Sequence, residues 1–149
     1  MPRSIRFSFA LPTLLLVGGL VGCGSGSLPP PSQRLPGKWH GEMIVYEEEV
    51  QGKLLPETIE KMGRTQWDFE FRQDGSMVLA AMNDEGRADR SEGRWEVVKQ
   101  EGDLLTVKST EQSGKQKNIN FEFDGADILY MPVKTEVAEL GAMRFTRMR

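Results

Sequence analysis

The side chains that most often perform chemistry are scarce in this sequence. Its 149 residues contain one histidine, His40, and one cysteine, Cys23. A metal site built from several imidazoles is therefore excluded, and so is a disulfide within the chain. Glu42 lies two residues after His40, on the same face of a predicted strand, but no further ligand stands at a suitable spacing. We interpret His40 and Glu42 as surface residues and predict no metal site.

Nucleophilic catalysis also lacks the residues that it needs. The sequence has no Gly-x-Ser-x-Gly motif, His40 stands outside any catalytic motif, and no glycine-rich phosphate loop follows a predicted strand. The 22 acidic residues leave one route open, because the fold could bring two carboxylates together for acid–base chemistry. We nevertheless expect a protein that is not an enzyme, with no catalytic residue and no cofactor.

The charged segments are interpreted as solvated surface. Residues 47–49 are three glutamates, which we expect at an exposed strand end. Residues 83–92 lack the Asp-x-Asp-x-Asp-Gly order of a calcium loop, and Arg87 and Arg90 would repel the cation, so we expect a polar loop. The formal net charge of -3 provides no basic stripe for a phosphate backbone. No nucleic-acid partner is therefore expected.

The first 22 residues have the composition of a secretory signal. Residues 1–6 contain Arg3 and Arg6 and no acid, and an apolar run follows at residues 7–20. That run has about 14 residues, whereas a helix that crosses a bilayer needs roughly 20. A basic start, a short apolar segment and small residues before a cleavage site are typical of a signal peptide.

The end of this segment, Leu20-Val21-Gly22-Cys23, resembles the lipobox of bacterial lipoproteins. The resemblance implies that residues 1–22 are removed and that Cys23 is acylated, so that membrane lipid is a partner of the chain. Gly24 follows the cysteine, where an aspartate would favour retention in the inner membrane. The resemblance therefore implies a lipid-anchored protein of the cell envelope, at the periplasmic side of the outer membrane more than at the inner membrane. Residues 23–36 are rich in glycine, serine and proline, and we expect them to tether a domain at residues 37–149.

The domain alternates apolar and polar residues with a period of two, which predicts strands. Asp74-Gly75 and Asp124-Gly125 favour the tight turns of hairpins, because such turns need positive φ angles. One short helix is predicted at residues 56–62, since Pro56 suits a first helical position and Gly63 a helix end. The eight predicted strands are residues 38–47, 65–71, 76–82, 93–99, 104–109, 118–123, 127–131 and 142–148.

Strands so closely spaced are expected to pair as antiparallel hairpins. Eight of them with one apolar face can close into an up-and-down barrel, although a two-sheet sandwich would show a similar alternation. We predict an all-β fold, a small eight-stranded antiparallel up-and-down barrel with one short helix between the first and second strands.

The opening Gly37-Lys38-Trp39 resembles the Gly-x-Trp start of lipocalins and of uncharacterised lipocalin-like bacterial lipoproteins. The resemblance implies a barrel whose Trp39 plugs the closed end while an arginine of the last strand packs over the indole ring. Arg147 is the candidate, with Arg144 as the second choice. Gly37, Trp39 and Arg147 are thus the structural signature that the resemblance implies.

The interior is expected to be rich in aromatic rings, and two interpretations stay open. Bulky rings at alternating positions can fill a small barrel, or they can line a pocket for an apolar ligand. The first favours a non-catalytic interaction or structural module that meets an envelope protein, and the second favours a binder or carrier of a small apolar ligand. A binder needs a cavity of roughly 300 Å³ or more. The candidate ligand-lining residues are Trp67, Phe69, Phe71, Trp95, Phe121, Phe123 and Phe145.

Overall fold

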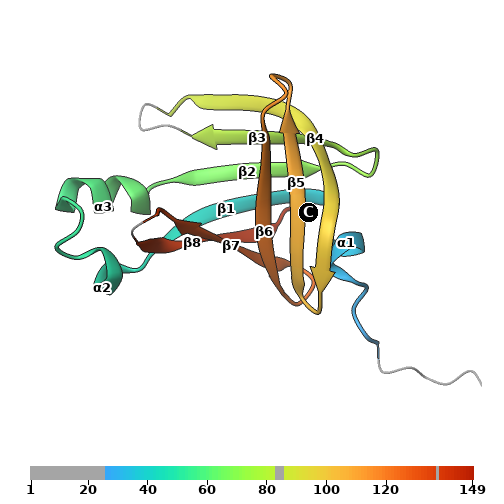
Figure 1. Cartoon of the computed structure of the whole chain (residues 1–149), viewed down its shortest axis with the longest axis horizontal. Coiled ribbons are helices and arrows are strands. Elements are labelled where there is room, and N and C mark those ends of the chain that lie inside the picture. Colours follow the sequence, from blue (N-terminus) through green and yellow to red (C-terminus); the bar gives the residue numbers. More distant parts are fainter. Residues whose placement is uncertain (1–25, 83–85, 137) are drawn as a thin grey trace, which may run out of the picture.

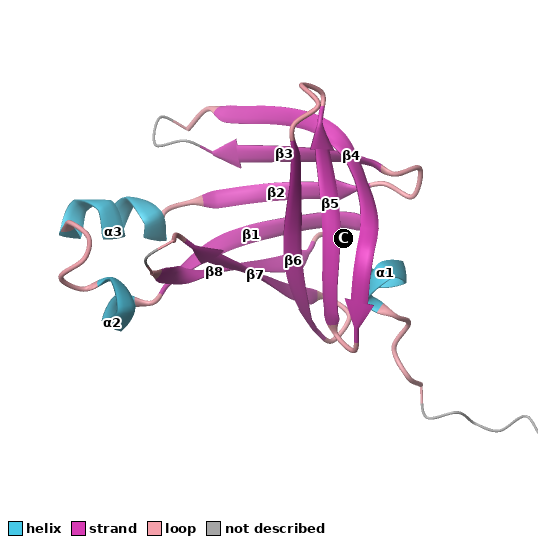
Figure 2. Ribbon diagram, in the orientation of Figure 1, coloured by secondary structure: helices cyan, strands magenta, loops and turns pink. Residues whose placement is uncertain are grey.

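The computed structural model describes residues 26–82, 86–136 and 138–149, which form a closed barrel of antiparallel strands (Figure 1, Figure 2). Each strand pairs with the next one along the chain, and the last strand pairs with the first. The predicted all-β up-and-down barrel is therefore confirmed. Its strands are β1 (Gly37–Val45), β2 (Gln66–Phe71), β3 (Ser76–Met82), β4 (Ala88–Glu101), β5 (Leu104–Glu111), β6 (Gln116–Asp124), β7 (Ile128–Lys134) and β8 (Glu139–Arg147).

Two short helices connect β1 to β2, and a third precedes the barrel. The predicted helix is present as α3 (Pro56–Gly63), whereas α1 (Pro31–Arg34) and α2 (Glu47–Val50) were not expected. The prediction that the three glutamates form a strand end is wrong. They are exposed, but they form the first turn of α2, which buries Val50.

β4 begins five residues before its predicted start. The expected polar loop is wrong for residues 88–92, which pair with β3, while residues 83–85 lie outside the described part of the chain. The pairing places Asp89 and Ser91 opposite Ala81 and Leu79, so both point toward the barrel interior. Polar residues at inward positions hide the alternation that indicates a strand, which is why the sequence suggested a loop.

The long β4 bends between two layers of strands. In Figure 1, β1, β2, β3 and β8 run across the view, and β5 and β6 cross it steeply. β4 runs along β3 and then turns to follow β5. A Cβ atom at Gly93 would collide with the backbone of Thr110, so the glycine allows the close approach of β4 and β5 at the bend. The crossing of the two layers leaves space between them.

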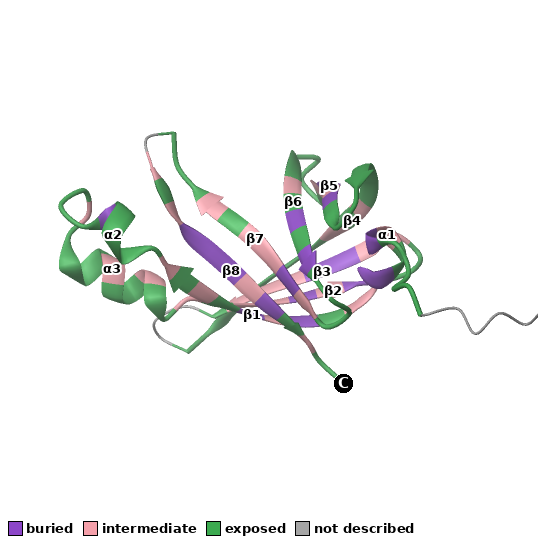
Figure 3. Cartoon of the chain, turned by 90° about the horizontal axis from the view of Figure 1, so that it is seen from below, coloured by how far each residue is buried: buried purple, intermediate pink, exposed green. Residues whose placement is uncertain are grey.

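Most of the buried apolar residues form one cluster, which lies on the inward faces of the strands and includes Leu35 before β1 (Figure 3). Gly41 is buried directly opposite Phe145, whose ring occupies the space that a side chain at residue 41 would need. All strand pairs and all members of the cluster lie between Leu35 and Arg147. Residues 26–149 therefore contain a complete closed sheet with its own core and form a self-contained folding unit.

Cys23 and the whole predicted signal peptide lie outside the described residues. The tether predicted at residues 23–36 stays a prediction, but its last part lies against the barrel. α1 buries Pro31 and Arg34, and Leu35 belongs to the core cluster. In the described part of the chain, no helix is long and apolar enough to cross a membrane.

Candidate functional site

One end of the barrel is closed by Trp39. The side chain is fully buried, and its indole Nε1 donates a hydrogen bond of 2.9 Å to the carbonyl oxygen of Leu35. The guanidinium Cζ of Arg147 lies 4.2 Å from the centre of the Trp39 ring. Nη1 of Arg147 also donates to the carbonyl oxygen of Pro36, at 3.0 Å. The contact that the lipocalin resemblance implies between Arg147 and Trp39 is therefore present, and the same arginine fastens the segment before β1.

A second arginine, which was not predicted from the sequence, covers the same end. Arg34 of α1 is buried, with its Cζ atom 4.7 Å from the centre of the Phe123 ring. Its Nη1 donates to the carbonyl oxygen of Gly125 and its Nη2 to a carboxylate oxygen of Asp103, each at 2.6 Å. Phe123 packs edge-on against Trp39, with ring centres 6.0 Å apart. Two guanidinium groups over two aromatic rings thus seal this end.

The predicted aromatic residues pack against one another, and two of them also border open space. Phe71 packs edge-on against Trp95 and Phe121, and Phe121 packs against Phe145, with ring centres 5.7 to 6.5 Å apart. Trp95 also donates its indole N–H to the carbonyl oxygen of Arg72, at 3.0 Å. Phe71, Trp95, Phe121, Phe123 and Phe145 therefore fill the barrel next to its closed end. Phe69 is buried and packs on Phe71 and Phe145, so it belongs to the same filling and forms its boundary. Trp67 is partly buried and lies farther along β2, where the filling stops.

Beyond these rings the barrel contains a cavity of about 360 Å³ that is open to solvent on one side. β2 to β7 contribute to its wall, whereas β1 and β8 do not. Five wall residues that were not predicted lie at alternate positions on the same strand face as the rings or as Leu129, and this alternation could have identified them. They are Met77, Leu79, Ile119, Met131 and Val133. The apolar part of the wall consists of Trp67, Phe69, Met77, Leu79, Ile119, Met131, Pro132 and Val133.

The cavity wall becomes polar toward the ends of β5 and β6. Ser109 is buried, and its hydroxyl donates to the carbonyl oxygen of Lys117 at 3.3 Å. Lys117 is two residues before Ile119 and four before Phe121, so it lies on the inward face of β6. Glu111 lies on the inward face of β5, and its carboxylate accepts a hydrogen bond of 3.4 Å from Ser113. The cavity therefore has an apolar base and a polar margin.

β6 and β7 diverge beside this cavity. Only Glu122, Phe123 and Asp124 of β6 pair with β7, although β6 is paired with β5 over most of its length. Figures 1 and 3 show the two strands meeting at their common turn and then separating. Residues 116–121 of β6 and 131–134 of β7 thus make no ladder bonds to each other, and we call these two segments the unpaired stretch. Residues from both segments border the cavity.

Pro132 explains where the pairing stops. The backbone N–H of Arg147 donates to the carbonyl oxygen of Asp127. Because backbone polar groups alternate in direction along an antiparallel strand, the N–H and C=O groups of residues 129 and 131 also point to β8, and those of residues 130 and 132 point to β6. Tyr130 pairs with Glu122, and the same register would place Pro132 opposite Asn120. Proline has no N–H to donate at that position.

His40 lies on the outer face of β1 and is not part of the cavity. Its Nδ1 lies 2.6 Å from a carboxylate oxygen of Asp68, and its Nε2 lies 3.9 Å from Glu42. Within the described ranges, no group of three or more histidine, cysteine or acidic side chains could hold a metal ion.

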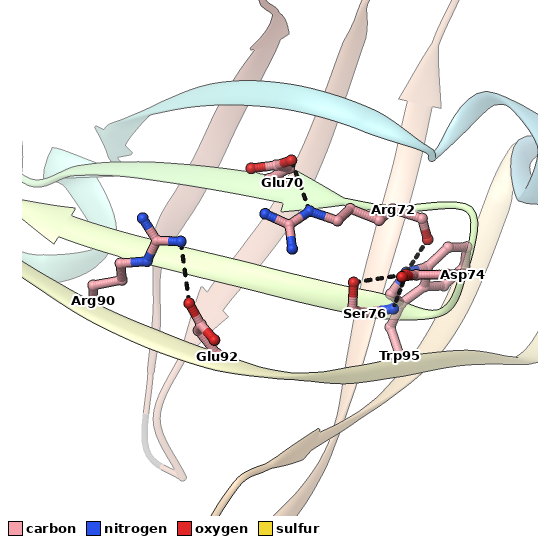
Figure 4. Close-up of polar contacts among 7 residues, drawn as sticks. All are labelled: Glu70, Arg72, Asp74, Ser76, Arg90, Glu92 and Trp95. Carbon is pink, nitrogen blue, oxygen red and sulfur yellow. Dashed lines mark hydrogen bonds and ion pairs between the residues drawn. The ribbon is translucent and has the colours of Figure 1, made fainter.

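The outer surface of the β2–β3 hairpin contains a second polar group, drawn in Figure 4. The Arg72 Nε donates to Glu70 at 2.9 Å, and this bond holds the pKa of the Glu70 carboxyl below its ordinary value. The Asp74 carboxylate accepts bonds from the hydroxyl and the backbone N–H of Ser76, which lower its pKa. These carboxylates do not border the cavity. Their bonds hold the turn between β2 and β3.

Comparison with known proteins supports the fold alone. No family model and no curated protein matches the chain. A redesigned β-barrel is similar over 83% of this chain and 100% of its own, with a TM-score of 0.50 and 17% sequence identity. A fluorescence-activating β-barrel designed de novo is similar over 81% of this chain and 100% of its own, with a TM-score of 0.45 and 13% identity.

Proposed function

We propose that this protein is a non-catalytic binder of a small apolar ligand, which it holds inside the barrel. The observation that supports this function is the cavity of about 360 Å³ beyond the packed aromatic core. A volume of roughly 300 Å³ or more is typical of small-molecule sites. The alternative, an interaction or structural module, requires no cavity, and the space therefore favours the binder.

The composition of the wall agrees with an apolar ligand. Met77, Leu79 and Met131 supply flexible aliphatic surface, and Trp67 and Phe69 supply aromatic surface. Burial of apolar surface contributes about 25 cal/mol per Å², so a short alkyl chain in this space would bind measurably. The methionines can adapt to ligands of different shapes.

Trp67 provides a reporter for binding. It borders the cavity, whereas Trp39 and Trp95 donate their indole N–H groups to backbone carbonyls in the filled part of the barrel. Titration of residues 26–149 with decanol should change the tryptophan fluorescence in a saturable manner. The change should be absent from a Trp67→Phe variant that still binds decanol by calorimetry.

Filling the cavity should abolish binding without unfolding the barrel. Leu79→Trp adds a ring to the cavity wall, and Met131→Trp does so from the opposite strand. Val98→Trp is the control, because Val98 is 53% exposed on β4 and does not border the cavity. Calorimetry should show decanol binding to wild type and the control but not to the filled variants. Wild-type affinity in both filled variants, or no saturable binding in wild type, would contradict the proposal.

The cellular place of this binder remains the one that its sequence implies. Acylation of Cys23 would hold the barrel at an envelope membrane, with residues 24–30 as a tether. A binder so placed would exchange its ligand with the periplasm or with the membrane beside it.

A further inference from the structure

The polar margin of the cavity contains two lysines on the two sides of the unpaired stretch. Lys117 belongs to β6 and Lys134 to β7, and both border the cavity. Neither ammonium group forms an ion pair with another residue in the described ranges, whereas four other lysines do so. Two unpaired cations therefore lie where the barrel wall is interrupted.

The acidic residues of the same wall are placed differently. Glu92 lies on the outer face of β4, paired across from Val78, and its carboxylate bonds to Arg90 at 3.1 Å. Glu111 points inward on β5, and the Ser113 hydroxyl donates to it. Neither carboxylate comes within ion-pair distance of Lys117 or Lys134. The two ammonium groups are thus available to an anion that enters from the solvent.

The neutral polar residues between the lysines add hydrogen-bonding groups. Asn118 and Asn120 of β6 border the cavity in the unpaired stretch, although Oδ1 of Asn120 already accepts a hydrogen bond of 2.9 Å from the Thr106 hydroxyl. In the residues of β6 that precede Glu122, the backbone makes no ladder bonds to β7. A polar group in this stretch can accept or donate without displacing an existing sheet bond, while a chain attached to it extends toward Trp67, Phe69 and Leu79.

We propose that the ligand is an amphiphile with one apolar chain and an anionic head, bound with its chain in the cavity and its head between Lys117 and Lys134. This inference rests on the proposed function, since it assumes that the cavity holds a ligand. It adds the chemical class of that ligand and the position of its charged end. An ammonium beside a partly desolvated carboxylate stabilises it by a charge-assisted hydrogen bond.

The test compares decanoate with decanol, which differ in the head and share the chain. Both are titrated by calorimetry at neutral pH into residues 26–149, wild type and the double variant Lys117→Gln, Lys134→Gln. The double variant should lose about tenfold in decanoate affinity and keep its decanol affinity. A control double variant, Lys38→Gln with Lys115→Gln, removes the same charge at residues outside the cavity and should leave both affinities unchanged.

A second variant tests the sign of the electrostatic effect. Glu111→Gln removes an inward carboxylate from the same wall, so decanoate should bind more tightly and decanol as before. Equal changes for decanoate and decanol in the lysine variant, or no change in either, would overturn the anionic head while leaving an apolar binder in place. Failure of wild type to bind either probe would overturn the proposed function itself.

Discussion

At the scale of single residues, two arginines determine which part of the barrel is solid. Arg34 and Arg147 cover Phe123 and Trp39, and both also bond to backbone carbonyls of neighbouring segments. A guanidinium can stack on a ring and direct several donors at once, whereas an ammonium cannot. The closed end therefore depends on the shape of the arginine head as well as on its charge.

Arg147→Lys should consequently destabilise the domain by about 1–3 kcal/mol, although the charge is kept. Urea unfolding of residues 26–149, monitored by circular dichroism, measures the loss. Arg144→Lys is the matched control, because Arg144 lies on the same strand without such a contact to Trp39. Equal losses in the two variants would show that the stacked geometry contributes nothing specific.

The turn carboxylate Asp74 gives the molecule a defined pH dependence. Its pKa is lowered in the folded chain by the Ser76 hydroxyl and then by the Ser76 backbone N–H. A group with a depressed folded pKa stabilises the fold above its unfolded pKa, and this contribution is lost as the pH falls through the folded pKa. The stability difference between wild type and Asp74→Asn should therefore be largest near neutral pH and should shrink below about pH 4.

Thermal unfolding from pH 7 down to about pH 2 measures this difference. Ser76→Ala removes the donor with the largest effect, so it should weaken the same pH dependence without removing the carboxyl. A stability difference between wild type and Asp74→Asn that stays constant across this range would contradict the assignment.

At this scale the sequence could predict only part of the site. The Arg147–Trp39 contact followed from the resemblance of Gly37-Lys38-Trp39 to lipocalins. Arg34 could not be predicted, because its partners Asp103 and Gly125 are far away in the sequence. The inward position of Lys117 could have been predicted, since it continues the inward series of Phe123, Phe121 and Ile119. Its place at the margin of a cavity could not, because the sequence does not show the space beside it.

At the scale of elements, the unpaired stretch between β6 and β7 is the feature that matters most. Ladder bonds are complete at the other strand pairs of the barrel except at bulges at Val98 of β4 and Leu140 of β8. The last pair between β6 and β7 before the divergence is Glu122 with Tyr130, and the next β7 residue that faces β6 is Pro132. A missing donor at that place interrupts the sheet where the cavity lies.

Pro132→Val should extend the ladder by restoring this donor. The new amide at position 132 is expected to exchange with solvent at least about tenfold more slowly than an exposed amide, because it would bond to the carbonyl of Asn120. Hydrogen exchange by NMR measures it, with the amide of Met131, which faces β8, as an internal reference. Decanol should also associate more slowly.

Exchange at position 132 as fast as at the exposed turn amide of Gln112 would contradict this explanation. The packing of the two layers would then hold β6 and β7 apart without any help from the proline.

Most elements could be predicted from the sequence because a hairpin depends on local signals, namely the alternation along each strand and the residues of the turn between them. Gly75 and Gly125 have φ angles of 83° and 74°, as their Asp-Gly turns indicated. The helix α1 was missed because Leu35 and Arg34 hold it through contacts with the barrel, and four residues have no helical preference of their own. The early part of β4 was missed because its inward residues Asp89 and Ser91 are polar and exposed, so the segment shows no apolar alternation.

At the scale of the whole molecule, the barrel combines a sealed end and an open one. The aromatic filling stabilises the fold, and the crossing of the two strand layers leaves the remaining volume free. The cavity could not be predicted from sequence, because identical inward patterns describe a filled and a hollow barrel. The position of the cavity depends on the divergence of β6 and β7, which no local pattern in the sequence indicates.

The predicted anchor concerns the molecule as a whole and is tested in cells. In a bacterial host, the full chain should appear in the membrane fraction, while Cys23→Ala should lose acylation and its membrane attachment. Mass spectrometry of the mature protein identifies the acyl groups. A Cys23→Ala chain that matures and still partitions into the membrane would contradict the lipoprotein interpretation.

The most direct test of the central claim is the native mass of residues 26–149 purified gently from an envelope compartment. We expect a stoichiometric extra mass on the wild-type domain and its absence from the folded Leu79→Trp variant. An amphiphile with an anionic head would agree with both proposals. A bare wild-type mass that persists after incubation with envelope lipids would contradict the claim that the barrel binds a ligand.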